Sequence, residues 1–230
     1  MQDSPFKEPL RQAGLIGTDL LHAHVITLDY GGGLLHRAVP AAFCRDEVLR
    51  RAGFRPISSR DYYGLNPAEL RCPAAPRRPC PNIPTIPVRV GTASAVAQVD
   101  TGYDDSRRPG VNINRAWLNQ LQAAGVPLRR DPPGDISLST CTGVSEPVRA
   151  YRLGAGTALE LMGEDDRPVR RLQEITLFLK DTPAAARPCG GIGTWDRPAA
   201  QLGASSVNDG TLVVDPVGQR LWFRPGPVAR

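Results

Sequence analysis

The sequence has no long run of apolar residues, although hydrophobic residues make up 41% of its 230 positions. Its apolar stretches are short and interrupted, so we expect no membrane-spanning helix. The N-terminal residues show no basic start followed by an apolar stretch, so we also expect no signal peptide in this chain. The apolar content is nevertheless sufficient for a core, and the length suits one large domain or one domain with additional pieces.

The residue spacings of a metal site are also missing. The five cysteines form no Cys-x-x-Cys pair, and none of the three histidines lies near them at zinc spacing. We therefore expect no metal and no cofactor. The histidines, His22, His24 and His36, have no nucleophile spaced near them and are interpreted as surface residues.

Basic residues exceed acidic ones without forming a cluster. The net charge is +5, and the arginines are scattered singly or in pairs such as Arg50-Arg51 and Arg129-Arg130. A surface that binds nucleic acid more often gathers basic residues on one face, with aromatic residues between them. We therefore expect a solvated basic surface and no nucleic-acid partner.

Glycine and proline are abundant, with 23 of each. This level indicates many turns, yet it is below the level of a disordered chain, and it is typical of a β protein with short strands. A helix is predicted at residues 114–124, where Asn114 is a good N-cap and Gly125 supplies the left-handed stop. Strand patterns occupy residues 86–91, 94–100, 147–153, 174–180, 211–215 and 220–223. The sequence therefore predicts a mainly β fold.

The chain divides into three regions that differ in composition and in predicted secondary structure. Residues 1–39 contain a strand, a turn at Gly31-Gly32-Gly33 and a returning strand, which is typical of a hairpin at the end of a domain. Residues 40–82 are interpreted as a connector, with a short helix at 45–52 and a stiff Pro-rich stretch from Cys72 to Pro81. Residues 83–230 form the main domain.

The two ends of the chain resemble each other. Leu15-Ile16-Gly17 and the hairpin after it match Gln201-Leu202-Gly203 and its hairpin, at a separation of 186 residues. Each unit has an apolar-Gly turn, a short helical stretch, and an Asp that ends the first hairpin strand, at Asp29 and Asp215. An internal repeat of this kind indicates two related units, of which the first keeps only its C-terminal part.

The motif that carries chemistry is Asp100-Thr101-Gly102. The tripeptide alone is weak evidence for a catalytic site, because short strings recur by chance. Its context strengthens it: Asp100 stands at the end of an apolar strand, and Gly102 permits a tight turn after it. Two more carboxylates follow at Asp104 and Asp105. A strand-ending turn without chemistry remains an alternative interpretation of the motif.

Residues 83–226 resemble the retropepsin-like aspartic peptidases. The matching stretches are 97–104 around the motif, 121–128 at the end of the predicted helix, 175–181, and Leu202-Gly203. Residues 139–143 stand where the family places its flap. The chain as a whole resembles the retropepsin-like and pepsin-like aspartic peptidase family, in the form of a bacterial aspartyl protease that lacks most of its first lobe. The resemblance implies a closed β-barrel lobe at 83–230, preceded by the remnant hairpin of another lobe.

The resemblance also implies a hydrolase whose substrate is a peptide or protein. In the family mechanism two carboxylates share one proton, and the ionised one activates a water molecule. By resemblance Asp100, Thr101 and Gly102 are the catalytic residues, and Tyr103, Asp104 and Gly143 bind substrate.

Two departures from the family pattern stand out. Gln201 occupies a position that is usually aliphatic, and the chain has no second Asp-Thr-Gly or Asp-Ser-Gly. An endopeptidase would therefore need a second Asp from a missing N-terminal segment or from a second copy in a homodimer. A non-catalytic binding module that keeps the cleft, and a purely structural β domain, remain alternatives.

The cysteines leave the compartment open. One interpretation is that all five cysteines are free thiols in a reducing compartment. The other is that four of them form two disulfides and one stays free, and the free one could be Cys44, Cys72, Cys80, Cys141 or Cys189. Cys72 with Cys80 would close a small loop, and Cys141 would meet Cys189 if the flap lies over that loop. Disulfides would favour an exported or periplasmic protein.

Overall fold

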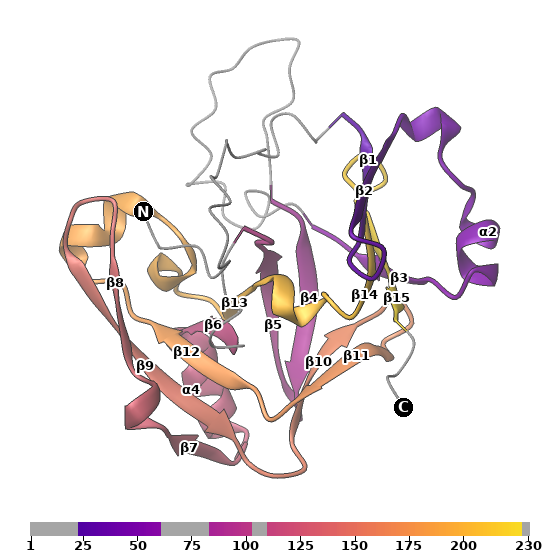
Figure 1. Cartoon of the computed structure of the whole chain (residues 1–230). Helices are drawn as coiled ribbons and strands as arrows, with labels where there is room; N and C mark the ends of the chain where they lie inside the picture. Colours follow the sequence, from indigo (N-terminus) through magenta and orange to yellow (C-terminus); the bar gives the residue numbers. More distant parts are fainter. Residues whose placement is uncertain (1–22, 61–82, 103–109, 227–230) are drawn as a thin grey trace.

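The computed structural model describes residues 23–60, 83–102 and 110–226 (Figure 1). These residues form a mainly β protein, as the sequence predicts. The first sheet has five strands, β1 (Val25–Asp29), β2 (Leu34–Ala38), β3 (Arg55–Ser58), β14 (Gly210–Asp215) and β15 (Arg220–Pro225). The second sheet has ten, β4 (Thr85–Val90), β5 (Ala93–Val99), β6 (Gly110–Asn114), β7 (Leu128–Arg130), β8 (Ile136–Ser139), β9 (Ser145–Leu153), β10 (Ala158–Met162), β11 (Pro168–Gln173), β12 (Thr176–Lys180) and β13 (Ala199–Leu202).

Short helices connect these strands. The α-helices are α2 (Asp46–Arg51) and α4 (Arg115–Ala123). The 3₁₀ turns are η1 (Pro40–Ala42), η3 (Pro132–Gly134), η4 (Ala184–Cys189), η5 (Ile192–Thr194) and η6 (Ala204–Ser206). Within the described residues, no helix has the length and apolar character needed to cross a membrane.

The five-stranded sheet has the order β2-β1-β14-β15-β3. It joins the N-terminal hairpin to the C-terminal hairpin, because β1 pairs antiparallel with β14. The predicted connector contributes α2, close to the expected 45–52, and also the strand β3, which was not predicted. The stretch from Cys72 to Pro81 lies outside the described residues.

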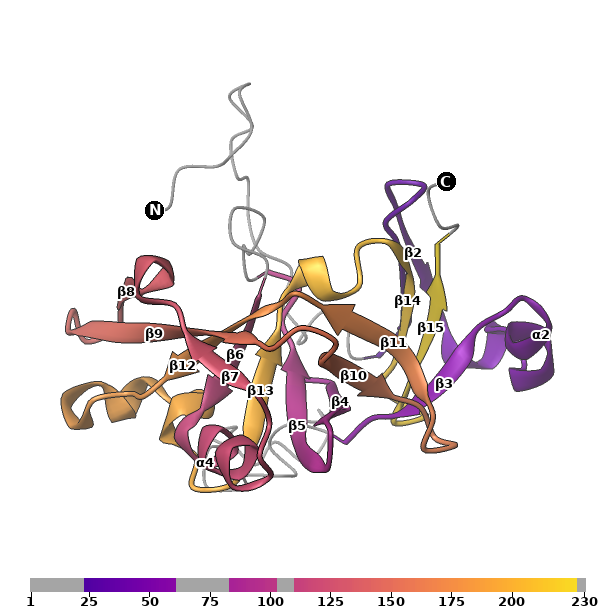
Figure 2. The same cartoon turned by 90° about the horizontal axis from the view of Figure 1, so that it is seen from below.

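The ten-stranded sheet does not close into the expected barrel, so that prediction was wrong. Its strand order runs β11-β10-β4-β5-β13-β6-β12-β9-β7, with β8 beside β9, and the end strands β11 and β7 do not pair with each other. The physical reason is α4, which packs on β5, β6, β12 and β13. Its buried Trp117, Leu118 and Leu121 fill the interior. The sheet therefore curves around a helix, as Figure 2 shows, instead of meeting its own far edge.

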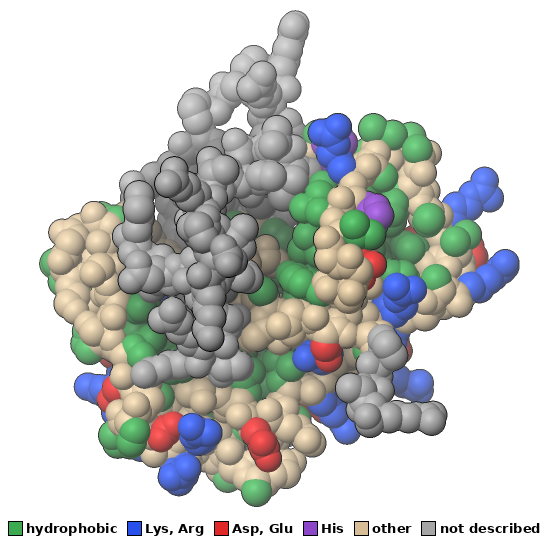
Figure 3. Space-filling view, in the orientation of Figure 1, with side chains coloured by type: hydrophobic (Ala, Val, Ile, Leu, Met, Phe, Trp, Pro, Cys, Tyr) green, Lys and Arg blue, Asp and Glu red, His purple; other side chains and the backbone are tan. Residues whose placement is uncertain are grey.

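One hydrophobic core spans both sheets. It contains Ile86 and Ile113 from the ten-stranded sheet together with Ile57, Leu212 and Phe223 from the five-stranded sheet. On the face seen in Figure 3, the Lys and Arg side chains lie apart from one another around the edge of the molecule. The shared core fixes the five-stranded sheet against β4 and β5, the hairpin that leads to Asp100.

Candidate functional site

Asp100 follows directly after β5, whose side chains alternate between two faces of the sheet. Ala95, Ala97 and Val99 belong to the shared core, and Ser94 is exposed on the opposite face. This alternation places Asp100, which is partly buried, on the face away from the core. The strand therefore places the carboxylate of Asp100 outside the apolar interior.

The strand β13 lies between β5 and β6. It runs parallel to β5 and antiparallel to β6, so its C-terminal end meets the C-terminal end of β5. The backbone N–H of Asp100 donates to the carbonyl oxygen of Leu202 at 2.9 Å. The structure thus brings together two stretches on which the family resemblance rests, Asp100-Thr101-Gly102 and Leu202-Gly203, about 100 residues apart in the chain.

The carboxylate of Asp100 accepts two hydrogen bonds from described residues. The side chain of Gln201 donates from Nε2 to Oδ2 at 2.7 Å, and the backbone N–H of Gly102 donates to Oδ1 at 3.2 Å. Asn112 in turn donates from Nδ2 to Oε1 of Gln201 at 2.8 Å. The described partners of Asp100 are therefore an amide and a peptide N–H, and not a second carboxyl group.

The remaining predicted site residues lie in different places. Thr101 and Gly102 are exposed beside Asp100. Gly143 lies in the turn between β8 and β9 with a φ of 76°, a conformation that favours glycine. No hydrogen bond within the described residues joins Gly143 to Asp100. Tyr103 and Asp104 lie outside the described residues, as does Asp105.

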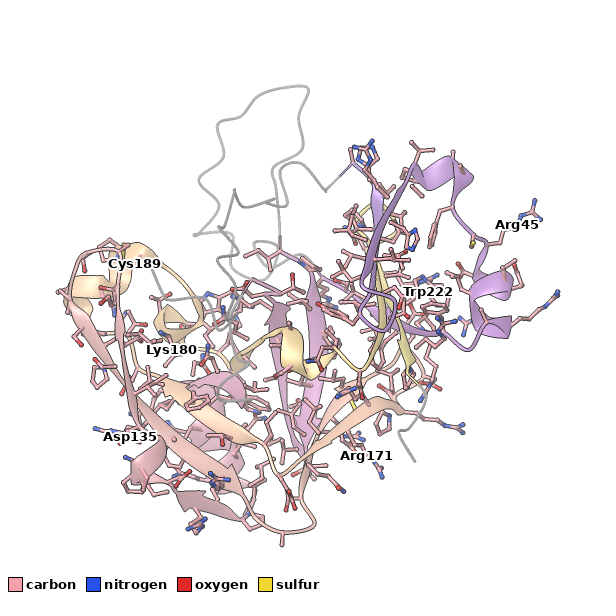
Figure 4. The ribbon with its side chains drawn as sticks, viewed as in Figure 1. Arg45, Asp135, Arg171, Lys180, Cys189 and Trp222 are labelled. Carbon is pink, nitrogen blue, oxygen red and sulfur yellow. A yellow bond between two sulfur atoms is a disulfide. The ribbon has the colours of Figure 1, made fainter. Side chains whose placement is uncertain are left out.

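The β8–β9 hairpin contains residues 139–143, for which the resemblance predicts a flap, and a disulfide holds its tip. Cys141 in the turn is bonded to Cys189 at the end of η4, which is the pairing expected if a flap lies over that loop. Figure 4 shows Cys189 beside the hairpin tip, with Lys180 below it. Cys44 is free and exposed, whereas Cys72 and Cys80 lie outside the described residues.

A buried ion pair supports the same hairpin. Glu146 in β9 is 2% exposed, accepts a hydrogen bond from Lys180 Nζ, and accepts another from Thr182 Oγ1 at 2.8 Å. Its charge is therefore compensated inside the protein.

The base of the hairpin is held by Asp135, directly before β8. Its carboxylate accepts both terminal guanidinium N–H groups of Arg130 at 2.7 Å, and the backbone N–H of Ala150 at 2.8 Å. Mainly through the hydrogen bonds from Arg130, and then through the one from Ala150, the pKa of Asp135 falls to about 2.

Sequence reasoning missed the two amides that lead to Asp100. Gln201 was noted only as a departure from the family pattern, and Asn112 was not placed on a strand. A usable signal was present, because Gln201 lies directly before Leu202-Gly203 and Asn112 stands between the apolar residues Val111 and Ile113. Their pairing required the sheet order, which no local pattern contains.

Comparisons with known proteins give distant structural likenesses. No family model and no curated protein matches the chain. It is similar to a retropepsin-like aspartic protease from Rickettsia conorii, with 14% identity and a TM-score of 0.34, over 62% of this chain and 82% of that one. It is also similar to basic 7S globulin from soybean, with 12% identity and a TM-score of 0.39, over 87% of this chain. The chain spans half the length of that globulin.

Proposed function

We propose that this chain carries one lobe of an aspartic endopeptidase, with Asp100 as its catalytic carboxylate. The observation that carries the proposal is the position of Asp100 at the end of β5, with its backbone bonded to Leu202 and its carboxylate accepting two N–H donors. Two donors of this kind hold the carboxylate in one orientation, and an oriented carboxylate can take a proton from a bound water molecule.

The reaction needs a second carboxyl group on the other side of the substrate. In such a pair the ionised Asp100 removes a proton from a water molecule, and the protonated partner donates a hydrogen bond to the scissile carbonyl oxygen. The partner Asp comes from a preceding segment or from a second copy of the chain. In this proposal Thr101 and Gly102 shape the catalytic loop, while Tyr103, Asp104 and Gly143 contact the peptide or protein substrate.

A non-catalytic binding module is the second candidate. The observation that favours it is the set of described partners of Asp100, which contains no carboxyl group. A chain of this kind would bind extended peptides beside Asp100 without cleaving them. The two candidates therefore differ in a single measurable property, hydrolysis that depends on Asp100.

The test is the substitution Asp100→Asn, which removes the charge and keeps the shape. Casein cleavage is measured at pH ~4.5, because a carboxyl pair works when it holds one proton. The chain is assayed over a range of concentrations and also as a longer polypeptide that includes its upstream coding sequence. In the form that cleaves, Asp100→Asn should reduce the rate by about 10³-fold or more.

The matched control is Asp215→Asn. Asp215 also ends an apolar strand, and its carboxylate also accepts a backbone N–H from a following glycine, Gly218, at 2.9 Å. A strand-ending turn without chemistry would make the two variants behave alike. Cleavage that survives Asp100→Asn, or the absence of cleavage by both forms of the wild type, contradicts the peptidase and leaves the binding module.

A further inference from the structure

Amide side chains form a row across the sheet beside Asp100. Gln201 on β13 lies opposite Gln98 on β5 and opposite Asn112 on β6. Asn112 is 2% exposed and Gln98 is 8% exposed, so two of these amides are deeply buried. Asp100 follows two residues after Gln98, directly beyond the end of β5. The row contacts its carboxylate through Gln201.

The hydrogen bonds along this row have a direction. Asn112 donates to the carbonyl oxygen of Gln201, so the NH₂ group of Gln201 points away from Asn112 and toward Asp100. The oxygen Oδ1 of Asn112 is buried without a hydrogen-bond partner in the described part of the chain. An unpaired buried acceptor costs stability, and the residue is nonetheless kept in the orientation that supplies a donor to Gln201.

We infer that Gln201 is a positioning residue for Asp100, oriented by Asn112. Its N–H fixes one carboxylate oxygen while the backbone N–H of Gly102 binds the other, so the plane of the carboxylate is set by two donors. This inference rests on the proposed function and deepens it, because it names the residues that hold the catalytic carboxylate in one orientation.

The test measures the reactivity of the Asp100 carboxylate directly. A small epoxide esterifies ionised carboxylates: a carboxylate oxygen attacks an epoxide carbon, the ring C–O bond breaks, and the alkoxide takes a proton from water. Labelling of Asp100 is followed by mass spectrometry in the wild type, in Gln201→Met, and in the control Gln98→Met. Gln98 has the same side chain on the neighbouring strand, and no described hydrogen bond joins it to Asp100.

Gln201→Met should slow labelling of Asp100 at pH ~4 by about tenfold, because the carboxylate loses the charge-assisted hydrogen bond that fixes one of its oxygens. Gln98→Met should change the rate by less than about twofold, since no hydrogen bond to Asp100 is lost. In the form that cleaves casein, Gln201→Met should lower kcat and leave KM unchanged. A merely structural loss would slow labelling to the same extent in Gln98→Met.

A second variant tests the inference independently of whether Gln201→Met folds. Asn112→Leu removes the donor that orients Gln201, and it should shift labelling in the same direction by a smaller factor. Equal labelling of Gln201→Met and Gln98→Met at pH ~4 overturns the inference, even if the chain is a peptidase. Selective slowing of Gln201→Met without any casein cleavage keeps the positioning of the carboxylate and removes the peptidase.

Discussion

Glu146 and Lys180 show how a single pair of residues supports the flap-like hairpin. The Glu146 side chain is 3% exposed and the Lys180 side chain is 17% exposed, so water does little to compensate either charge. Burial of both charges is tolerated because each compensates the other and Thr182 satisfies the remaining carboxylate oxygen. Breaking such a pair is costly, since the surviving charge keeps its position without a partner.

We predict that Lys180→Met lowers the free energy of unfolding by about 3 kcal/mol, because it leaves Glu146 buried and unpaired. The double variant Glu146→Leu with Lys180→Met should lose less, since it leaves no buried charge. Urea unfolding at neutral pH measures both. Arg115→Met is the control, because Arg115 pairs with Asp181 on the surface and should cost at most about 1 kcal/mol. Equal losses from Lys180→Met and Arg115→Met would refute the role of the buried pair.

The β8–β9 hairpin is attached at both ends, by the Cys141–Cys189 disulfide at its tip and by Asp135 at its base. Because hydrogen bonds from Arg130 and Ala150 lower the pKa of Asp135 to about 2, this carboxyl group makes the folded state more stable at pH values above its unfolded pKa of about 3.9. That contribution is lost as the pH falls from about 4 to about 2. The base of the hairpin should therefore remain fixed across the acidic range in which a carboxyl pair works.

Asp135→Asn tests this dependence. At pH ~6 the variant should exchange the backbone amide of Ala150 faster than the wild type, because the charge-assisted acceptor is gone. Below pH ~2 the two proteins should exchange alike, since the wild-type carboxyl is then protonated as well. Hydrogen exchange resolved by NMR measures this difference, with the amides of β5 as an internal control. A difference of equal size at both pH values would show that the charge of Asp135 has no part in it.

Local signals were sufficient for some elements and not for others. The helix α4 was predicted because its signals are adjacent in sequence: Asn114 accepts the N–H of Trp117, and Gly125 has a φ of 68°. The strand β6 was missed although Val111 to Asn114 alternate between apolar and polar residues, because it is only five residues long and its last residue, Asn114, was assigned as the N-cap of the helix. The strand β3 contains Pro56, which discourages a strand prediction and is tolerated here at a sheet edge.

The same distinction applies to the site. Asp100, Thr101 and Gly102 are contiguous, so a motif located them, and the resemblance supplied the pairing of Cys141 with Cys189. The contacts of Gln201 with Asp100 and Asn112 span about 100 residues of sequence, and they exist only because β13 inserts between β5 and β6. Barrel closure was also not predictable from local patterns, because it depends on the packing of α4 against β5, β6, β12 and β13, which are distant in the sequence.

At the scale of the whole molecule, the two hairpins of the five-stranded sheet are related by a local two-fold axis. β1 and β14 pair antiparallel with Thr27 opposite Val213, and these positions are 186 residues apart, which is the separation of the sequence repeat. The hairpin turns after Asp29 and Asp215 are also of equal length. Equivalent strands of the repeat therefore pair with each other, as strands do across a symmetric interface.

This symmetry bears on the source of the second Asp. A second copy of the chain would use the same axis by pairing its β14 with the β14 of the first, but β1 already occupies that edge. Among the described strands, the edges of this sheet are β2, where Leu34 and Leu35 are more than half exposed, and β3. For the proposed peptidase, the β1–β14 pairing therefore favours a partner lobe that is continuous with the β1–β2 hairpin over a second copy paired through β14.

We accordingly predict that the 230-residue chain is silent as a monomer and as a dimer, and that activity appears when a preceding segment with a second Asp-Thr-Gly is restored. The physical reason is that one carboxylate cannot both take the proton from water and donate one to the carbonyl oxygen. Fractions separated by size are assayed against casein at pH ~4.5, each beside its Asp100→Asn variant. Cleavage confined to the dimer would show that β1 yields its place to a second copy. Cleavage by the monomer that Asp100→Asn abolishes would show that another group of this chain replaces the second carboxyl.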